Sequence, residues 1–144
     1  MARRVLSTMR GIVYSDGASR GNPGIAGCGA IVFNTTGDVI AMAKKFLGKE
    51  ITNNVAEYQG LLLALDVAKN HNLETIEILM DSQLVVKQMQ GEYRVKQEHL
   101  KMLHQQANEK AKMFQSVIYR AIPRKENSKA DELANQAIDE QVHK

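Results

Sequence analysis

Four acidic residues stand at places where a folded chain could bring them together. Asp16 follows a short apolar run typical of a strand, and Asp81 follows a second such run over residues 75–80. Glu57 and Asp131 lie near the starts of two segments whose apolar residues recur at helical spacing. Carboxylates that converge without a counter-charge repel one another, so a cluster of these acids indicates bound cations. Ligands that are all oxygen favour Mg²⁺ or Mn²⁺ over Zn²⁺.

Such a site would support the hydrolysis of a phosphodiester. Two divalent cations about 3.5–4 Å apart can hold the attacking and the leaving oxygens of an in-line phosphoryl displacement. Mg²⁺ also keeps several of its waters and accepts phosphate oxygens as ligands, so one water can supply the nucleophile. The four acids are therefore the candidate catalytic residues and the candidate ligands of two ions that bind together with substrate.

Taken singly, each acid also has a structural interpretation. Asp16 could belong to an Asp-Gly turn. The other three could cap helices, Asp81 directly and Glu57 and Asp131 as the acidic members of capping boxes that begin at Asn54 and Ser128. Helix caps have no reason to converge, whereas metal ligands must, so the positions of the four acids together favour the metal site.

The apolar patterning predicts the elements that would position these acids. Strands are expected over residues 11–16, 25–33, 38–47, 75–80 and 117–122, with a loop over 17–24 and a hairpin turn over 34–37. Helices are expected over residues 54–70 and 82–90, from Leu100 to Phe114, and around residues 133–138. The predicted order is therefore βββ-α-β-αα-β-α.

This order predicts an α/β fold on a mixed five-stranded sheet, with three antiparallel strands followed by two parallel ones and with helices on its faces. Parallel neighbours need crossover connections, which the helices supply. If the strands that end at Asp16 and Asp81 are parallel neighbours, both acids project from the carboxyl edge, where ligand sites of α/β sheets gather. The 144 residues suit one domain, with residues 1–10 as a flexible lead-in.

Composition narrows the classes of function. The net charge of +3 and the pI near 9.0 are compatible with a polyanionic partner. No apolar run reaches the roughly 18–20 residues that cross a bilayer, and the N-terminus lacks the apolar stretch of a signal peptide, so we expect a cytoplasmic protein. Cys28 is the only cysteine, which excludes an intrachain disulfide and a Cys-rich metal site. We expect it to be a small buried side chain.

Four stretches of the chain together resemble the type 1 ribonuclease H family (ribonuclease HI). They are YSDGASRGNPG from Tyr14 to Gly24, TNNVAE from Thr52 to Glu57, MDSQ from Met80 to Gln83 and NSKADELAN from Asn127 to Asn135. The resemblance extends over roughly residues 10–140 and implies the ribonuclease H-like fold. It also implies endonucleolytic hydrolysis of the RNA strand of an RNA–DNA hybrid, which leaves 3′-hydroxyl and 5′-phosphate ends.

The resemblance further implies roles for individual residues. Asp16 would bridge both metals, Asp131 would complete the site of the water-activating metal, and Glu57 and Asp81 would hold the leaving-group metal. Glu57 would also lie near a 2′-hydroxyl of the RNA, which distinguishes RNA from DNA. The implied substrate-binding residues are Ser19, Asn22, Asn53 and Gln83 for the minor groove of the hybrid, and Thr52 and Asn54 for a DNA-strand phosphate. Asn22 and Asn54 could instead, or also, serve a turn and a helix cap.

The chain departs from the family in two places. Many relatives have a histidine in the loop before the last Asp, whereas residues 122–127 contain none. Arg124 is a candidate stand-in that could hold phosphate or water, although a guanidinium cannot be a general base near pH 7. Some bacterial relatives also insert a strongly basic helix and loop, but residues 91–97 carry only two basic residues. Affinity for the hybrid would then be weaker, or would depend on the C-terminal helix or a partner.

Two other functions stay open at this point. A non-catalytic hybrid- or RNA-binding protein could share the fold, although it would gain nothing from clustered negative charge that faces phosphates. A nuclease of the same superfold that acts on double-stranded RNA could share the four acids as well. We expect a monomer whose partner is an RNA–DNA hybrid and which has no membrane partner.

Overall fold

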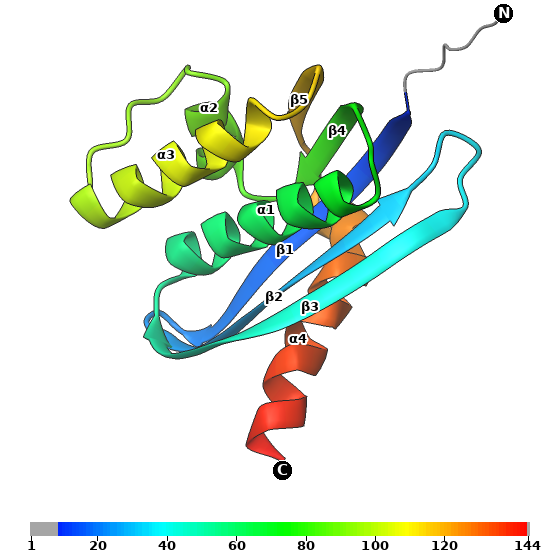
Figure 1. Cartoon of the computed structure of the whole chain (residues 1–144). Helices are drawn as coiled ribbons and strands as arrows, with labels where there is room; N and C mark the ends of the chain where they lie inside the picture. The colour runs from blue at the N-terminus through cyan, green and yellow to red at the C-terminus, as the bar shows by residue number, and fades with distance from the viewer. Residues whose placement is uncertain (1–8, 144) are drawn as a thin grey trace, which may run out of the picture.

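The computed structural model describes residues 9–143, which form a five-stranded sheet with helices on both faces (Figure 1). The strands are β1 (Arg10–Gly21), β2 (Gly24–Phe33), β3 (Val39–Ile51), β4 (Thr75–Met80) and β5 (Ser116–Ala121). The helices are α1 (Asn53–Asn70), α2 (Gln83–Met89), α3 (Glu98–Ala111) and α4 (Ser128–Val142), with a short 3-10 helix, η1 (Arg124–Asn127). The predicted order βββ-α-β-αα-β-α is confirmed.

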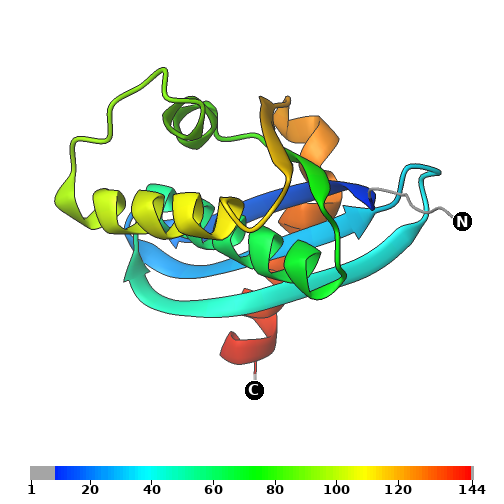
Figure 2. The same cartoon turned by 45° about the horizontal axis from the view of Figure 1, so that its top comes forward.

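The strands lie in the order β3-β2-β1-β4-β5. Strand β2 is antiparallel to both of its neighbours, β1 and β3. Strand β4 is parallel to β1 and β5 is parallel to β4, so the predicted mixed sheet is also confirmed. Helix α1 lies across β1, β2 and β3 on one face, and α3 packs against α1 (Figure 2). Helix α4 covers the same three strands from the opposite face. The central strand β1 is therefore enclosed by helices on both sides.

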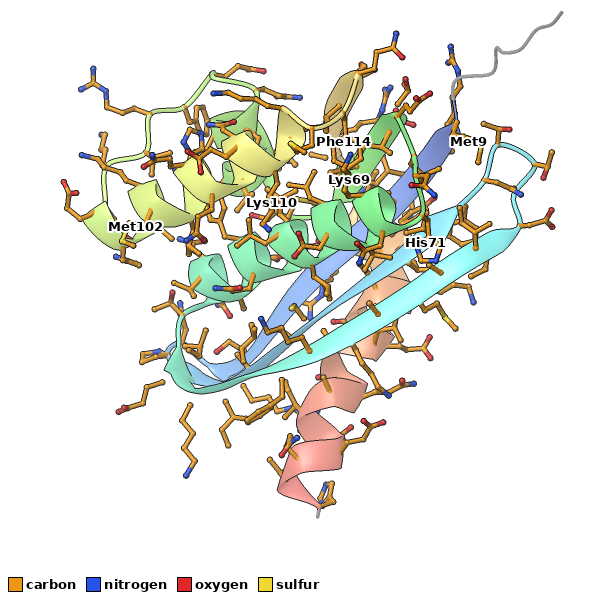
Figure 3. All side chains as sticks on the ribbon, in the orientation of Figure 1. Met9, Lys69, His71, Met102, Lys110 and Phe114 are labelled. Carbon is orange, nitrogen blue, oxygen red and sulfur yellow. The ribbon has the colours of Figure 1, made fainter. Side chains whose placement is uncertain are left out.

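The main apolar core lies between the sheet and the helices α1, α2 and α3. Leu61 and Leu65 of α1 are four residues apart, on one helical face, and both are buried against the sheet. Lys110 of α3 reaches toward α1, where its Nζ lies 2.7 Å from a carboxylate oxygen of Asp66 (Figure 3). Phe114 was predicted to end α3, but the helix ends at Ala111 and the buried Phe114 ring enters the core from the following turn.

The largest difference from the prediction concerns residues 17–24, which were expected to be a loop. Residues 17–21 instead continue β1 and pair with residues 24–28 of β2, so the turn consists only of Asn22 and Pro23. The glycines that favoured a loop prediction lie in or next to the strand, and some of them allow neighbouring elements to approach it closely. Strand β3 is likewise longer than predicted and runs to Ile51.

The predicted flexible lead-in covered residues 1–10. Residues 1–8 of this segment lie outside the described residues. Arg10 already belongs to β1, and the carbonyl oxygen of Met9 accepts hydrogen bonds from the backbone N–H groups of Glu74 and Thr75 at 2.8 and 3.1 Å. The prediction was therefore wrong for its last two residues, which the ladder toward β4 holds in place.

Candidate active site

The four acidic residues line one cavity of about 470 Å³. Asp16 comes from the middle of β1, and Asp81 directly follows β4. Glu57 comes from the second turn of α1, and Asp131 from the first turn of α4. Residues that are far apart in the chain, on four different elements, therefore converge as the metal-site hypothesis requires.

The parallel ladder between β1 and β4 explains why the two aspartates are neighbours. Tyr14 is opposite Leu79 in this ladder, and two further residues along each chain lead to Asp16 and Asp81. The strand β4 ends at Met80, whereas β1 continues beside β2. Asp16 was predicted to end its strand, but it lies within the strand. It is still level with the carboxyl edge of β4.

Two glycines allow the helices to come close to Asp16 from both faces of the sheet. A Cβ atom on Gly17 would lie only 2.1 Å from the backbone oxygen of Ala56 in α1. Gly29 is opposite Asp16 in β2, and a Cβ atom there would lie 2.6 Å from the Cβ of Leu133 in α4. Side chains at these two positions would push both helices, and the acids that they carry, away from Asp16.

We expect Gly17→Ala to lower the free energy of unfolding by about 1–3 kcal/mol, the usual cost of overpacking. The added methyl group meets helix backbone, which cannot rotate away, so α1 and Glu57 must shift and turnover should fall as well. Gly11→Ala is a matched control in the same strand, because its methyl group meets the flexible end of Leu73 at 2.6 Å and comes no closer than 3.2 Å to backbone, at the carbonyl oxygen of Phe33. Urea denaturation of both variants measures the difference, and equal losses would contradict the close approach at Gly17.

The carboxylates are close enough to change one another's ionisation. One oxygen each from Asp16, Glu57 and Asp81 lies within 4.8 Å of the other two. Burial, followed by the charges of Glu57, Asp81 and Asp131, raises the pKa of Asp16 to about 10. Burial and the charge of Asp81 raise the pKa of Glu57 to about 8, although the backbone N–H of Gly17 donates a 3.0 Å hydrogen bond to it. Without a counter-charge, the ionised cluster therefore costs free energy.

The donor set fits hard divalent cations. Its candidate ligands are carboxylate oxygens, and no thiol or imidazole occurs among the described residues that line the cavity. Cations there would supply the counter-charge that the raised pKa values call for. Cys28 is buried, as expected, and burial raises the pKa of its thiol to about 12, so it stays protonated at neutral pH.

The structural interpretations of the four acids are wrong. Asp16 lies inside a strand and not in a turn. The hydroxyl oxygens of Thr52 and Ser82 accept the capping hydrogen bonds of α1 and α2, both at 3.3 Å, so neither helix uses an acid or Asn54 as its cap. At α4 the N-cap position belongs to Asn127 and not to Ser128. None of the four acids is needed where it stands to begin a helix.

The predicted substrate-binding residues are divided between the cavity and its surroundings. Ser19 and Asn53 line the cavity together with the acids, as does Arg124, the candidate auxiliary residue. The Oδ1 of Asn22 accepts a 3.0 Å hydrogen bond from the backbone N–H of Asn53, which ties the β1–β2 turn to the start of α1. Thr52 caps α1, as described above. These contacts establish structural duties, while the roles in substrate binding stay predictions.

The other two predicted substrate-binding residues lie outside the acidic cavity. Asn54 lines a separate groove of about 430 Å³, whose lining also includes Tyr93, Arg94 and Lys96. Gln83 is the first residue of α2, directly after the capping Ser82, and its side chain is exposed. Asn54 is thus separated from Asn53, its neighbour in the chain, because successive residues of a helix point in different directions.

Three polar residues at the site were not singled out from the sequence. Arg20 and Asn135 line the cavity, and the buried Asn127 donates from Nδ2 to the carbonyl oxygen of Ser15 at 2.9 Å. Asn127 and Asn135 stand four residues before and after Asp131, a spacing that places side chains on one helical face and could have revealed them. For Arg20 no comparable signal exists, because its neighbours come from the far end of the chain.

Known proteins of similar sequence and structure agree with this geometry. A family model described as reverse transcriptase-like matches residues 14–137. The bifunctional protein Rv2228c of Mycobacterium tuberculosis is 45% identical over 132 residues, which make up 91% of this chain and 36% of that protein. The solved N-terminal RNase H domain of the same protein is 43% identical, with a TM-score of 0.89 over 94% of this chain and 97% of that domain. The chain belongs to the type 1 ribonuclease H family.

Other members of the ribonuclease H family are similar over most of the chain. Ribonuclease HI of Halobacterium salinarum is 39% identical over 88% of this chain and 63% of that protein. LC11-RNase H1, solved in complex with an RNA/DNA hybrid, is 37% identical, with a TM-score of 0.86 over 92% of this chain and 99% of that one. This ribonuclease H chain thus spans about a third of the length of the mycobacterial relatives. Within residues 9–143, no helix is both long and apolar enough to cross a membrane.

Proposed function

We propose that this protein hydrolyses the RNA strand of RNA–DNA hybrids, with divalent cations held by Asp16, Glu57, Asp81 and Asp131. The observation that carries the proposal is the convergence of these four carboxylates from four elements into one cavity. Bound cations would supply the counter-charge and activate a water as the nucleophile. The relatives named ribonuclease HI, and the hybrid bound to LC11-RNase H1, support the choice of substrate. The expected products carry 3′-hydroxyl and 5′-phosphate ends.

The geometry supports a division of labour among the acids. Asp16 lies in the group of three with Glu57 and Asp81, and Asp131 is close enough to Asp16 to raise its pKa although it is not part of that group. Asp16 is therefore the natural shared ligand. Glu57 and Asp81 would complete one cation site with it, and Asp131 would complete the other.

Polar and basic groups beside the acids would hold the two strands. The RNA strand would enter the acidic cavity, where Ser19 and Asn53 line the wall. The DNA strand would follow the groove of Asn54, Arg94 and Lys96, where the two positively charged side chains attract phosphates. Contacts of this kind bind backbone and shape and do not depend on base sequence. The groove would thus supply the positive charge that an inserted basic segment supplies in some relatives.

Arg124 would take part in the same site without acting as a base. It begins η1 and lines the cavity that holds the acids. A guanidinium stays charged near pH 7, so it can hold a phosphate oxygen or a water but cannot remove a proton. Proton removal would then depend on water and the carboxylates.

Comparison of three labelled substrates tests the proposal. We expect the RNA strand of an RNA–DNA hybrid to be cut in millimolar Mg²⁺ or Mn²⁺, with 5′-phosphate ends, and to stay intact in EDTA. Duplex DNA and duplex RNA of the same sequence should be cut far more slowly. Duplex DNA has no 2′-hydroxyl, and the groove of duplex RNA differs in shape from that of the hybrid. Cutting of duplex RNA at a comparable rate would favour the alternative nuclease. Tight binding of the hybrid without cleavage would favour a binding protein.

A further inference from the structure

Arg20 lies in the wall of the acidic cavity, but its hydrogen bonds lead to α4. Its Nη1 lies 2.8 Å from Oδ1 of Asp139, and its Nη2 donates a 3.1 Å hydrogen bond to Oδ1 of Asn135. Asn135 in turn donates from Nδ2 to Oδ1 of Asp131 at 3.2 Å, and to the carbonyl oxygen of the same residue at 3.0 Å. An unbroken series of hydrogen bonds therefore runs from Asp139 through Arg20 and Asn135 to Asp131.

The polarity of this series determines which way the Asn135 amide faces. An asparagine amide can turn by 180° and exchange its oxygen and nitrogen, which would place an oxygen against the Asp131 carboxylate. A guanidinium only donates hydrogen bonds, so Arg20 requires the amide oxygen on its own side. The NH₂ group of Asn135 must then face Asp131. The half-buried Asp131 carboxylate accepts this hydrogen bond, so the Asn135 amide restrains the Asp131 side chain.

We propose that Arg20 is a positioning residue that acts through Asn135 to orient the Asp131 carboxylate. The inference rests on the proposed function, in which Asp131 is a metal ligand. Hydrogen-bond partners of metal-ligating side chains orient them, and their loss typically costs about 10- to 100-fold in metal affinity or activity. The Arg20 and Asp139 side chains are 43% and 50% exposed, so as an ion pair alone they would contribute little to stability.

The same helix offers a matched control. Lys44 of β3 pairs with Glu140 and lies 3.4 Å from the amide oxygen of Gln136, both of them on α4. This cluster resembles the Arg20 cluster in its partial exposure, and each of the two joins a strand of the sheet to α4. None of its three members belongs to the residues that line the acidic cavity. Its removal should therefore leave Asp131 undisturbed.

The experiment is a calorimetric titration of the full chain with Mn²⁺ in the absence of hybrid, followed by hybrid-cleavage kinetics. Arg20→Met and Asn135→Leu should each weaken Mn²⁺ binding by on the order of 10-fold and lower kcat similarly, with KM for the hybrid changed less than about 2-fold. Lys44→Met should match the wild type. The double variant of Arg20 and Asn135 should bind Mn²⁺ no more weakly than Asn135→Leu alone. Arg20 acts on Asp131 only through Asn135, so the two effects should not add.

The possible failures can be told apart. If the wild type cleaves hybrid and binds Mn²⁺ but Arg20→Met binds Mn²⁺ as well as Lys44→Met does, the positioning role is wrong and the proposed function survives. A raised KM in Arg20→Met with unchanged Mn²⁺ affinity would mean that Arg20 contacts substrate directly, which also overturns the proposal. If the wild type neither binds Mn²⁺ nor cleaves, the proposed function fails and the inference fails with it. Urea denaturation of each variant confirms that it is folded before it is compared.

Discussion

Asp16→Asn is expected to lower the turnover of hybrid cleavage by on the order of 10²–10³ or more. Loss of a preorganised charged group at a reaction centre commonly costs this much, and loss of a shared metal ligand would cost more. Asn has nearly the shape of Asp, and the side chain is 4% exposed in the middle of β1, so the fold should be unchanged. Single-turnover cleavage of a labelled hybrid measures the effect.

The same substitution should make the metal-free protein more stable. Burial and three neighbouring carboxylates raise the pKa of Asp16, so the native state without cations must either take up a proton or bear the repulsion. Asn removes that cost, whereas a substitution that damaged the fold would lower both stability and activity. Glu132→Gln, at the exposed residue after Asp131, is the control and should change neither. Near-wild-type turnover of Asp16→Asn in a nuclease-free preparation would contradict the metal assignment.

In EDTA, the free energy of unfolding should fall as the pH is raised from mildly acidic to mildly alkaline values. Asp16 and Glu57 have folded-state pKa values of about 10 and about 8, against ordinary values of 3.8 and 4.5. Above the ordinary values, the folded state keeps protons that the unfolded state releases. The stability from these groups is therefore fully present below about pH 4 and is lost as the pH rises through about 8 for Glu57 and toward about 10 for Asp16.

Divalent cations should oppose this loss. A cation at 100 times its Kd adds about 2.7 kcal/mol to the free energy of unfolding, and the gain should be larger at alkaline pH because the ligands must be deprotonated to bind. Urea denaturation at about pH 5 and about pH 8.5, in EDTA and in Mg²⁺, measures both effects. In EDTA the slope should be smaller for Asp16→Asn than for the wild type. The same slope in both proteins would contradict the assignment of the titration to the acidic cluster.

Much of the fold could be predicted because local patterns and general rules of connection were enough. The run of residues 75–80 was predicted as a strand with the bounds that β4 has. The rule that parallel strands need crossovers allowed β1 and β4 to be parallel neighbours, the arrangement in which Asp16 lies beside Asp81, and the structure has this pairing. Helix α1 was predicted to within one residue of its start, from apolar residues at helical spacing that include Val55, Leu61 and Leu65.

What could not be predicted depends on elements that meet only in the folded molecule. Gly17 signals a turn when the chain is inspected locally, and its actual role is visible only when the backbone of α1 is seen beside it. The hydrogen bonds of Arg20 depend on where the last helix crosses the first strand, which no local pattern encodes. Asn53 and Asn54 are adjacent in the chain, but Asn53 lines the acidic cavity and Asn54 lines the groove, because successive residues of a helix point in different directions.

The placement of Asp16 at the centre of β1 has a consequence for how activity is lost. Strand β1 pairs on both edges, with β2 and β4, and carries helices on both faces, so it belongs to the part of the molecule that opens last. Fraying of a terminus or a loop leaves Asp16, the residue at the centre of the acidic cluster, in its place. Heat should consequently inactivate this protein in one step, at the temperature where the whole sheet melts.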